Sequence, residues 1–228
     1  HVQDVLTGAH AQRGPDNMRV QAAQAASEAG RLPVAPVRMW MQGEWRDTLL
    51  MNMELHSRPT ISHRPQVARW LADATMALYQ ENAHEAEGLL QRALQVEPDA
   101  PDLWNNLAAA YEMLGRMAEA EAAMRQAFQR HPDYVFARIS MARLALSKGQ
   151  LDQAEDLLET LFSRKQFHFD EFAAFSNVHL ELCLAQGKPD VARSWLDLWA
   201  GLEPDHPVVA EWQKRLGEKG GRECILRR

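Results

Sequence analysis

The residues best suited to chemistry form one group in the C-terminal half of the chain. His179 and Glu181 make a His-x-Glu pair, in which the histidine can bind zinc and the glutamate can transfer a proton. His168, Asp170 and Cys183 are nearby residues of types that zinc also accepts. The Pro-Cys-x-x-Cys sequence that completes such a site is absent. His179 and Cys183 are four residues apart, which favours the inward face of a helix, where both residue types are often buried. We therefore expect a packed histidine and a buried cysteine rather than a metal site.

The other histidines, cysteines and short motifs do not suggest a catalyst. His56 and His63 could share a metal, but each lies in a proline-rich segment without further ligands, so we interpret both as solvated linker residues. Cys183 and Cys224 are too few for a disulfide framework. The sequence has no glycine-rich phosphate loop and no His-Glu-x-x-His, Cys-x-x-Cys or Gly-x-Ser-x-Gly motif. The prediction is a protein that is not an enzyme and has no metal and no cofactor.

Composition and charge narrow the class of partner. Hydrophobic residues make up 46% of the chain and charged residues 25%, which is typical of a globular protein and not of a disordered one. The net charge of −6 disfavours nonspecific binding to nucleic acid, because that binding requires a basic surface. No run of residues approaches the roughly 18 apolar residues of a membrane-spanning helix. We expect neither a nucleic-acid partner nor a membrane span.

The elements that position these residues follow from an internal repeat of 34 residues. The residues that coincide at this shift are small, aromatic or turn-forming: Trp70 with Trp104, Ala86 with Ala120 and Ala154, Gly115 with Gly149, and Pro98 with Pro132. An insertion of four residues within 163–172 changes the shift to 38, after which Gly187, Ala192 and Pro204 occupy the equivalent places. A fixed period of this length with helical patterning indicates stacked helix–turn–helix repeats.

These residues resemble the tetratricopeptide repeat family. The repeat at 101–134 carries the family pattern almost throughout, at Trp104, Leu107, Ala108, Tyr111, Gly115, Ala120, Ala127 and Pro132. The resemblance covers residues 67–206 and implies four repeats, at 67–100, 101–134, 135–172 and 173–206. Three places depart from the pattern: Glu81 and Asn82 stand where glycine is expected, Gln166 replaces a closing proline, and Trp199 replaces a small residue.

Small side chains account for the helix pairs physically. Each repeat is two short antiparallel helices that cannot bury their own apolar faces, so stacking on neighbouring repeats supplies the stability. We expect Ala108 and Ala120 where the two helices of one repeat cross, because only a methyl-sized side chain lets the backbones approach closely. We expect Gly115 to end the first helix in a left-handed conformation. The prediction is an all-α, right-handed superhelix of tetratricopeptide repeats.

The proline-aspartate pairs are expected to separate one repeat from the next. The prolines should end one repeat, and the aspartate that follows each of them should cap the next helix. These prolines are Pro98, Pro132 and Pro204.

The segments that flank the repeats read differently. Residues 1–31 read as partial or degenerate repeat helices. No charged segment followed by an apolar stretch is visible, so we expect a cytoplasmic location. A chain that begins at His1 reads as a fragment or processed form that has lost any targeting signal, which leaves the periplasm as the alternative. Residues 32–66 fit no repeat. Their alternation around Gln42-Gly43 predicts a β-hairpin, and a crossover with a helix over 47–55 is the alternative. In the hairpin, Val37, Met39 and Met41 would share one face, with Trp40 on the other.

Residues 207–228 read as a capping helix and tail, with Val208, Val209, Trp212 and Leu216 on one side.

The resemblance also implies a function. In the family, the first helices of successive repeats line a concave groove that binds a peptide or a segment of a partner protein. The corresponding residues are Leu71, Thr75, Asn105, Ala109, Glu112, Ile139, Arg143, Asn177 and Glu181. Asn105 and Asn177 can each hydrogen-bond to a peptide backbone, Ile139 can offer an apolar contact, and Arg143 can pair with a carboxylate.

We therefore predict a non-enzymatic scaffold with a protein or peptide partner. Two alternatives remain open at the level of sequence. One is a structural or assembly factor of a bacterial envelope, pilus or secretion complex, which would use its edges or the hairpin. The other is the non-catalytic part of a larger enzyme.

Overall fold

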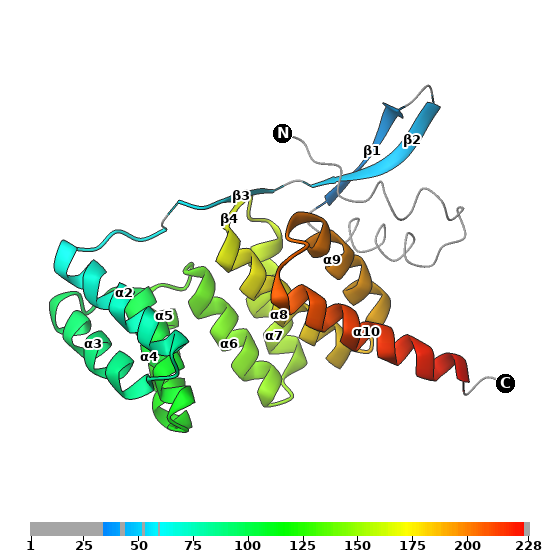
Figure 1. The fold of residues 1–228 in the computed structure, drawn as a ribbon. Coiled ribbons are helices and arrows are strands. Elements are labelled where there is room, and N and C mark those ends of the chain that lie inside the picture. The colour runs from blue at the N-terminus through cyan, green and yellow to red at the C-terminus, as the bar shows by residue number, and fades with distance from the viewer. Residues whose placement is uncertain (1–33, 42–43, 52, 59, 226–228) are drawn as a thin grey trace. The chain divides into compact units, whose positions relative to one another are not determined.

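The fold is described from a computed structural model of the chain (Figure 1). It describes residues 34–41, 44–51, 53–58 and 60–225, with side chains over 53–58 and 60–217. The elements are β1 (Val34–Met41), β2 (Glu44–Met51), β3 (Glu54–His56), α2 (Pro65–Tyr79), α3 (Ala83–Val96), α4 (Pro101–Met113), α5 (Met117–Arg130), α6 (Val135–Ser147), α7 (Leu151–Phe162), β4 (Gln166–His168), α8 (Phe169–Ala185), α9 (Pro189–Leu202) and α10 (Pro207–Ile225). The helices predicted within residues 1–31 lie outside the described residues. None of the described helices is long and apolar enough to cross a membrane.

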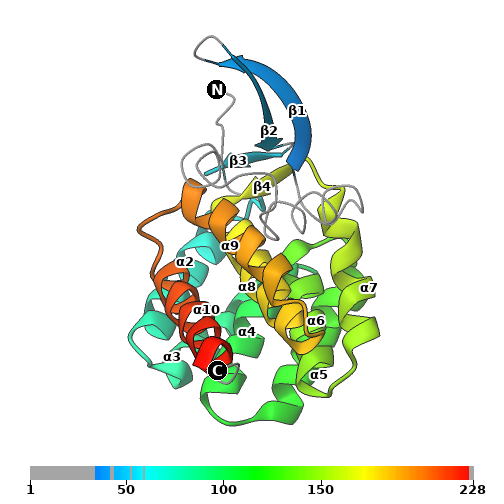
Figure 2. The ribbon, with the colours of Figure 1, turned by 90° about the vertical axis from the view of Figure 1, so that its right-hand side faces the viewer.

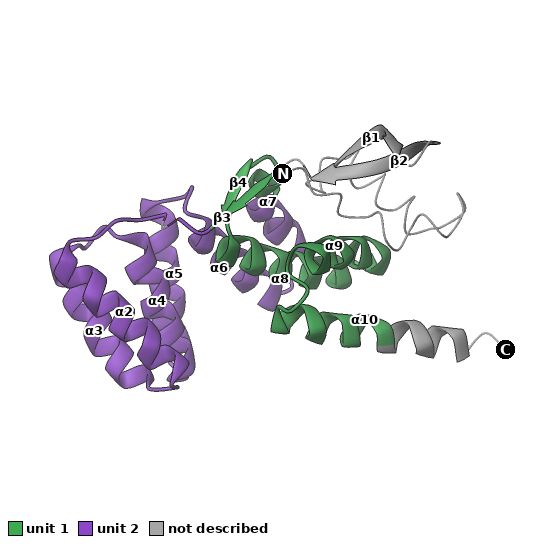
Figure 3. Ribbon diagram, turned by 45° about the horizontal axis from the view of Figure 1, so that its top comes forward, with its two compact units in different colours: residues 1–56, 159–228 green, residues 57–158 purple. Residues whose placement is uncertain are grey.

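The chain divides into two compact units, which Figure 3 distinguishes by colour. Unit 2 comprises residues 57–158, and unit 1 comprises residues 1–56 and 159–228. Unit 2 contains the helix pairs α2–α3 and α4–α5, followed by α6 and most of α7. Unit 1 contains the strands and the packed helices α8, α9 and α10 (Figures 1 and 2). Tandem packing of helices confirms the predicted all-α repeat fold.

Alanines at helix crossings account for the close packing within the repeats. Ala86, Ala120 and Ala154 lie on the second helices α3, α5 and α7, and their exposed fractions are 0%, 1% and 0%. Ala108 on α4 is 1% exposed and packs in the same apolar cluster as Ala120. In unit 1, Ala192 on α9 is 0% exposed. The prediction that the recurring small residues face the helix interfaces is confirmed.

The turns inside the repeats share one backbone conformation. Gly115, Gly149 and Gly187 have positive φ angles of 72°, 72° and 70°. Glu81, at the equivalent place in the first repeat, has a φ of 59°. A side chain in this left-handed region costs on the order of 1–2 kcal/mol, because Cβ comes too close to the following carbonyl oxygen. The predicted left-handed Gly115 is confirmed, and Glu81 adopts the same conformation without the advantage of glycine.

The turns between repeats correct the predicted caps. Asp99 and Asp133 follow prolines but lie inside the turns, so α4 begins after Ala100 and α6 after Tyr134. Neither N-cap residue makes a side-chain hydrogen bond to its helix. Asp99 instead forms an ion pair with Arg130. Each aspartate lies one residue before the N-cap. The side chain that reaches the free N–H groups of the first turn is the one at the N-cap itself, so these aspartates do not cap the helices.

The insertion within 163–172 contains a short strand. β4 pairs in parallel with β3, and Leu55 is the register partner of Phe167 (Figure 2). Phe167 is fully buried and stacks on Phe175 of α8 at a ring separation of 5.8 Å. The repeat therefore lacks its closing proline because Gln166 begins this strand. His168 then caps α8, since its Nδ1 atom accepts a hydrogen bond from the Asp170 N–H at 3.2 Å.

The predicted β-hairpin is confirmed. β1 and β2 pair antiparallel, and Trp40 is the register partner of Trp45. The alternative helix over 47–55 is wrong, because β2 runs to Met51 and β3 follows at Glu54. The predicted placement of Val37, Met39 and Met41 opposite Trp40 concerns side chains outside the described ones, so it stays a prediction.

The last helix packs through an apolar face on unit 1. Val209, Trp212 and Leu216 of α10 are 0%, 4% and 3% exposed. His206, rather than Asp205, caps this helix, because its Nδ1 atom accepts a hydrogen bond from the Val208 N–H at 3.3 Å. α10 packs on α9, and Trp212 also reaches α8 through a hydrogen bond to Asn177.

Candidate functional site

The residues predicted to line a groove lie on the first helices of the repeats. Leu71 and Thr75 are on α2, Asn105, Ala109 and Glu112 on α4, Ile139 and Arg143 on α6, and Asn177 and Glu181 on α8. Those on α2, α4 and α6 belong to unit 2, and those on α8 belong to unit 1.

One of these residues is not available to a partner. Ile139 is only 6% exposed, so the prediction that it offers an apolar contact is wrong. The reason is the environment of α6, whose buried residues are Val135, Ala137, Ile139, Ser140, Met141, Ala142 and Ala145. These positions are distributed around the whole helix, so α6 has no continuous solvent-facing side.

The two asparagines bond within the chain. The Asn105 Oδ1 atom accepts a hydrogen bond from the Ser140 hydroxyl at 2.9 Å. The Asn177 Oδ1 atom accepts one from the Trp212 indole nitrogen at 2.7 Å. Each contact joins the first helix of a repeat to the helix two places further along the chain, α4 to α6 and α8 to α10. The predicted peptide-binding asparagines therefore use an acceptor to join helices of this chain.

The remaining predicted residues show a range of exposure. Thr75 is exposed, and its hydroxyl donates to the Leu71 carbonyl at 2.8 Å. Leu71 is partly buried against the core of the first repeat. Ala109 and Glu181 are also partly buried. Their role in a groove stays a prediction.

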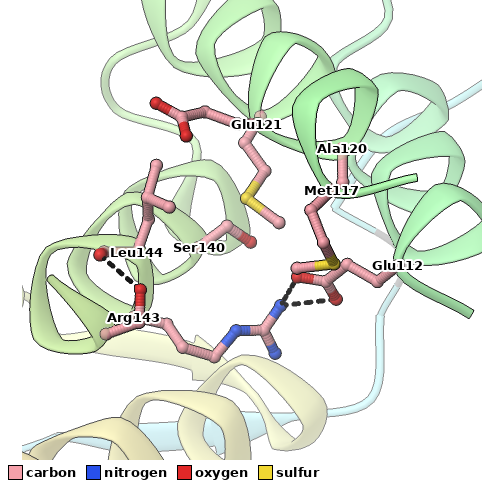
Figure 4. A pocket seen from close by; sticks show the side chains of 9 residues that line it. Glu112, Met117, Ala120, Glu121, Ser140, Arg143 and Leu144 are labelled. Atoms are coloured by element: carbon pink, nitrogen blue, oxygen red, sulfur yellow. Dashed lines mark hydrogen bonds and ion pairs between the residues drawn. The ribbon is translucent and has the colours of Figure 1, made fainter. Parts of the chain in front are cut away.

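Glu112 and Arg143 come together across the space between α4 and α6. The Arg143 Nη2 atom lies 3.1 and 3.0 Å from the two carboxylate oxygens of Glu112. The Arg143 side chain is 50% exposed, and the Glu112 side chain is 30% exposed. Figure 4 shows the guanidinium reaching this carboxylate beside Met117. The carboxylate predicted to pair with Arg143 is therefore supplied, in this structure, by another predicted groove residue.

This ion pair borders a pocket between α5 and α6. The pocket has a volume of about 230 Å³ and is lined by Glu112, Met117, Ala120, Glu121, Met124, Ser140, Arg143, Leu144 and Ser147 (Figure 4). Ala120, Met124 and Ser140 are 1%, 4% and 9% exposed, so they form its floor. Met117 is 60% exposed at the rim. The pocket therefore leads from exposed apolar surface to a buried and largely apolar floor.

A second set of charges ties the other edge of the pocket. Glu121 accepts hydrogen bonds from Lys148 Nζ at 2.8 Å and from Arg125 Nη2 at 2.5 Å. The pKa of Glu121 is lowered by the hydrogen bond from Lys148 and then by that from Arg125, so this carboxylate is ionised near neutral pH. The Lys148 contact joins α6 to α5, as Arg143 joins α6 to α4.

The chemistry-bearing histidines and cysteine occupy other places. His179 and Cys183 are 4% and 2% exposed, and the Cys183 sulfur lies 3.4 Å from His179 Nε2. His179 packs on the Trp195 ring at a centroid distance of 4.6 Å. The predicted packed histidine and buried cysteine are confirmed. Within the described residues, no three His, Cys, Asp or Glu side chains are placed to hold a metal ion.

His63 was misinterpreted from sequence. Its side chain is 5% exposed, so it is not a solvated linker residue. Its ring nitrogens lie 2.6 Å from Glu97 Oε2 and 2.7 Å from Asp102 Oδ2. These partners are 34 and 39 residues away along the chain, so no local sequence signal identifies them.

The fold and two family matches together define the class of protein. Antiparallel helix pairs with alanine at the crossings and a left-handed residue at each turn are the features of an α-helical repeat protein. Two family models described as tetratricopeptide repeat match the chain, over residues 71–135 and 114–175. Residues 71–175 of the chain therefore belong to the tetratricopeptide repeat family. Repeats of this family generally mediate protein–protein interaction and are typically non-catalytic scaffolds.

Proposed function

We propose that unit 2 binds a partner polypeptide by receiving one large apolar side chain in the pocket between α5 and α6. The observation that carries the proposal is a buried apolar floor that opens to solvent beside the exposed Met117. An aliphatic-lined cavity of about 150 Å³ is large enough to bind benzene. The volume here, about 230 Å³, is therefore sufficient for an aromatic or long aliphatic side chain.

The side chains of the pocket suit an apolar guest. Met117 and Met124 have flexible, polarizable thioethers, which adapt to different guests and make favourable contacts with aromatic rings. The Glu112–Arg143 pair and the Glu121–Lys148 pair tie α6 to α4 and α5, and so fix the walls relative to one another. Binding would then remove apolar surface from water without first ordering the site.

The charges at the edge favour an acidic neighbour to the apolar residue. Arg125 and Lys148 share one carboxylate, that of Glu121. Their side chains are 49% and 43% exposed, so both remain accessible to a partner. We therefore propose a partner segment in which a large apolar residue lies next to an aspartate or glutamate.

Panning a library of random displayed peptides on the full chain tests this function. The blocking variant is Ser147→Trp, because Ser147 is an exposed residue of the pocket lining and a large side chain there fills the opening. The matched control is Gln129→Trp, at an exposed position of α5 outside the lining. Burial of a large apolar side chain contributes about 1.5–3 kcal/mol, so blocking should weaken binding about tenfold or more.

The selected sequences and the variants decide the outcome. The proposal expects peptides enriched in a large apolar residue with an adjacent acidic one, which lose affinity for Ser147→Trp and keep it for Gln129→Trp. Selected peptides without an apolar residue, or with equal affinity for both variants, would contradict pocket binding. Failure to select any peptide would also count against it.

A further inference from the structure

A short segment before α2 is fastened to the junction of α3 and α4. This segment, residues 60–64, is called the strap. His63 reaches Glu97, the C-cap of α3, and Asp102, in the first turn of α4, at 2.6 and 2.7 Å. The backbone N–H of Arg64 donates to the other oxygen of Glu97 at 2.9 Å. Three polar contacts therefore attach the strap to elements more than 30 residues further along the chain.

Both contacts of the His63 ring require a proton. A carboxylate is only an acceptor, so each ring nitrogen must donate, and an imidazole donates from both nitrogens only when it is charged. Loss of one proton would place a nitrogen lone pair against a carboxylate oxygen less than 3 Å away. Glu97 and Asp102 are 20% and 14% exposed, so either carboxylate would also lose a cation that water cannot fully replace.

Apolar packing contributes little to holding the strap. A recess of about 320 Å³ lies beside it, lined by Ile61, Ser62, His63, Glu97, Pro98, Asp99 and Ala100. Thr60, Ser62 and Arg64 are exposed, and Ile61 is only partly buried. The attachment therefore depends on the polar contacts of His63 and Arg64.

Other charged groups lie in the turn between α3 and α4 and in the strap itself. Asp99, in the turn between α3 and α4, is 81% exposed and pairs with Arg130 of α5. The His131 Nε2 atom donates to the Asp99 carbonyl at 2.6 Å. Arg64, in the strap itself, adds a positive charge near Glu97. The carboxylates that face the His63 ring are Glu97 and Asp102, and both favour its charged form.

We propose that the strap is a proton-dependent clasp, closed on the α3–α4 junction while His63 is an imidazolium and released when it becomes neutral. Release exposes the carboxylates of Glu97 and Asp102 at the junction of the first and second repeats. This inference is independent of the pocket between α5 and α6. It uses no residue of that pocket.

The geometry also sets the direction of the pH response. Burial lowers the pKa of His63, but the hydrogen bonds to Glu97 and Asp102 outweigh burial and raise it above 6.5. The clasp should therefore stay closed through mildly acidic pH and open as the pH rises through the raised pKa.

Hydrogen exchange of the Arg64 amide in the full chain measures opening directly, because that N–H is one of the three contacts. Two variants alter the clasp: His63→Gln cannot become charged, and Asp102→Asn removes one carboxylate. The matched control is His84→Gln, an exposed histidine on α3. NMR titration of the His63 ring gives its pKa in each protein.

In the wild type, protection of the Arg64 amide, corrected for the intrinsic exchange rate, should fall up to about tenfold per pH unit above the pKa of His63. His63→Gln should show low protection at every pH, Asp102→Asn should shift the fall to lower pH, and His84→Gln should match the wild type. A wild-type protection factor that does not change across the His63 titration would overturn the proposal. So would a His63 ring that titrates at or below 6.5, a measurement that requires no variant.

Discussion

The Trp212 indole nitrogen donates a hydrogen bond to the Asn177 amide oxygen at 2.7 Å, from α10 to α8. The Ser140 hydroxyl makes the same kind of contact with Asn105, from α6 to α4. Both pairs are 35 residues apart, one repeat plus one residue. An asparagine at one recurring position therefore joins the first helix of a repeat to the helix two places further along the chain.

Asn177→Ala should destabilise unit 1 by about 1–3 kcal/mol, because it leaves the nearly buried Trp212 N–H without an acceptor. Chemical denaturation followed by circular dichroism measures the change. Trp212→Phe and the double variant complete a double-mutant cycle. Purely additive effects would mean that the hydrogen bond contributes nothing.

Ala86→Leu should lower the free energy of unfolding by about 1–3 kcal/mol, because Ala86 is fully buried in the first repeat and a larger side chain overpacks the crossing of α2 and α3. Ala118→Leu, at an exposed position of α5, should change it by no more than about 0.5 kcal/mol. Thermal or chemical denaturation distinguishes the two. Similar losses would contradict the role of the recurring alanines.

Glu81→Gly should stabilise unit 2 by roughly 0.5–1 kcal/mol. Glycine relieves the left-handed strain at φ 59° but adds entropy to the unfolded chain, which offsets part of the gain. Gln80→Gly is the control, because Gln80 has an ordinary φ of −87° and should lose stability. Loss of stability in Glu81→Gly would argue that the residue is not strained.

His63 should stabilise unit 2 only while it is charged. Its folded-state pKa is raised, so its contribution is complete below the ordinary value of 6.5 and is lost as the pH rises through the raised pKa. The pKa of Glu97 is lowered, first by the hydrogen bond from His63, so its contribution is present above 4.5 and is lost as the pH falls through the lowered pKa. The free-energy difference between wild type and His63→Gln should therefore be largest between pH 4.5 and 6.5, at about 1–2 kcal/mol. A difference that is independent of pH would contradict the paired imidazolium.

Sequence periodicity was enough to predict the repeat fold. A small side chain is required where two helices of one repeat cross, which explains alanine at Ala86, Ala120 and Ala154. A positive φ in the turn explains glycine at Gly115 and Gly149. Both reasons act within a single repeat. The alternation around Gln42-Gly43 likewise predicted the pairing of β1 with β2.

Contacts between distant residues could not be predicted in the same way. The clasp joins His63 to carboxylates 34 and 39 residues away, and no sequence pattern marks such a partnership. Burial of Ile139 depends on how many neighbours surround α6, which periodicity does not specify. The pocket was not predicted: two of the expected groove residues, Glu112 and Arg143, border it, but Met117 and Met124, which supply its apolar surface, were not among them.

The most direct test of the proposed function follows the methionine methyl groups by NMR while a selected peptide is added to the full chain. Met117 and Met124 line the pocket, and Met76 is a 58% exposed methionine on α2 that lies outside its lining. If the pocket receives the peptide, the methyl resonances of Met117 and Met124 shift with peptide concentration while that of Met76 stays unchanged. Unshifted resonances of Met117 and Met124 in the presence of bound peptide would contradict the proposed function.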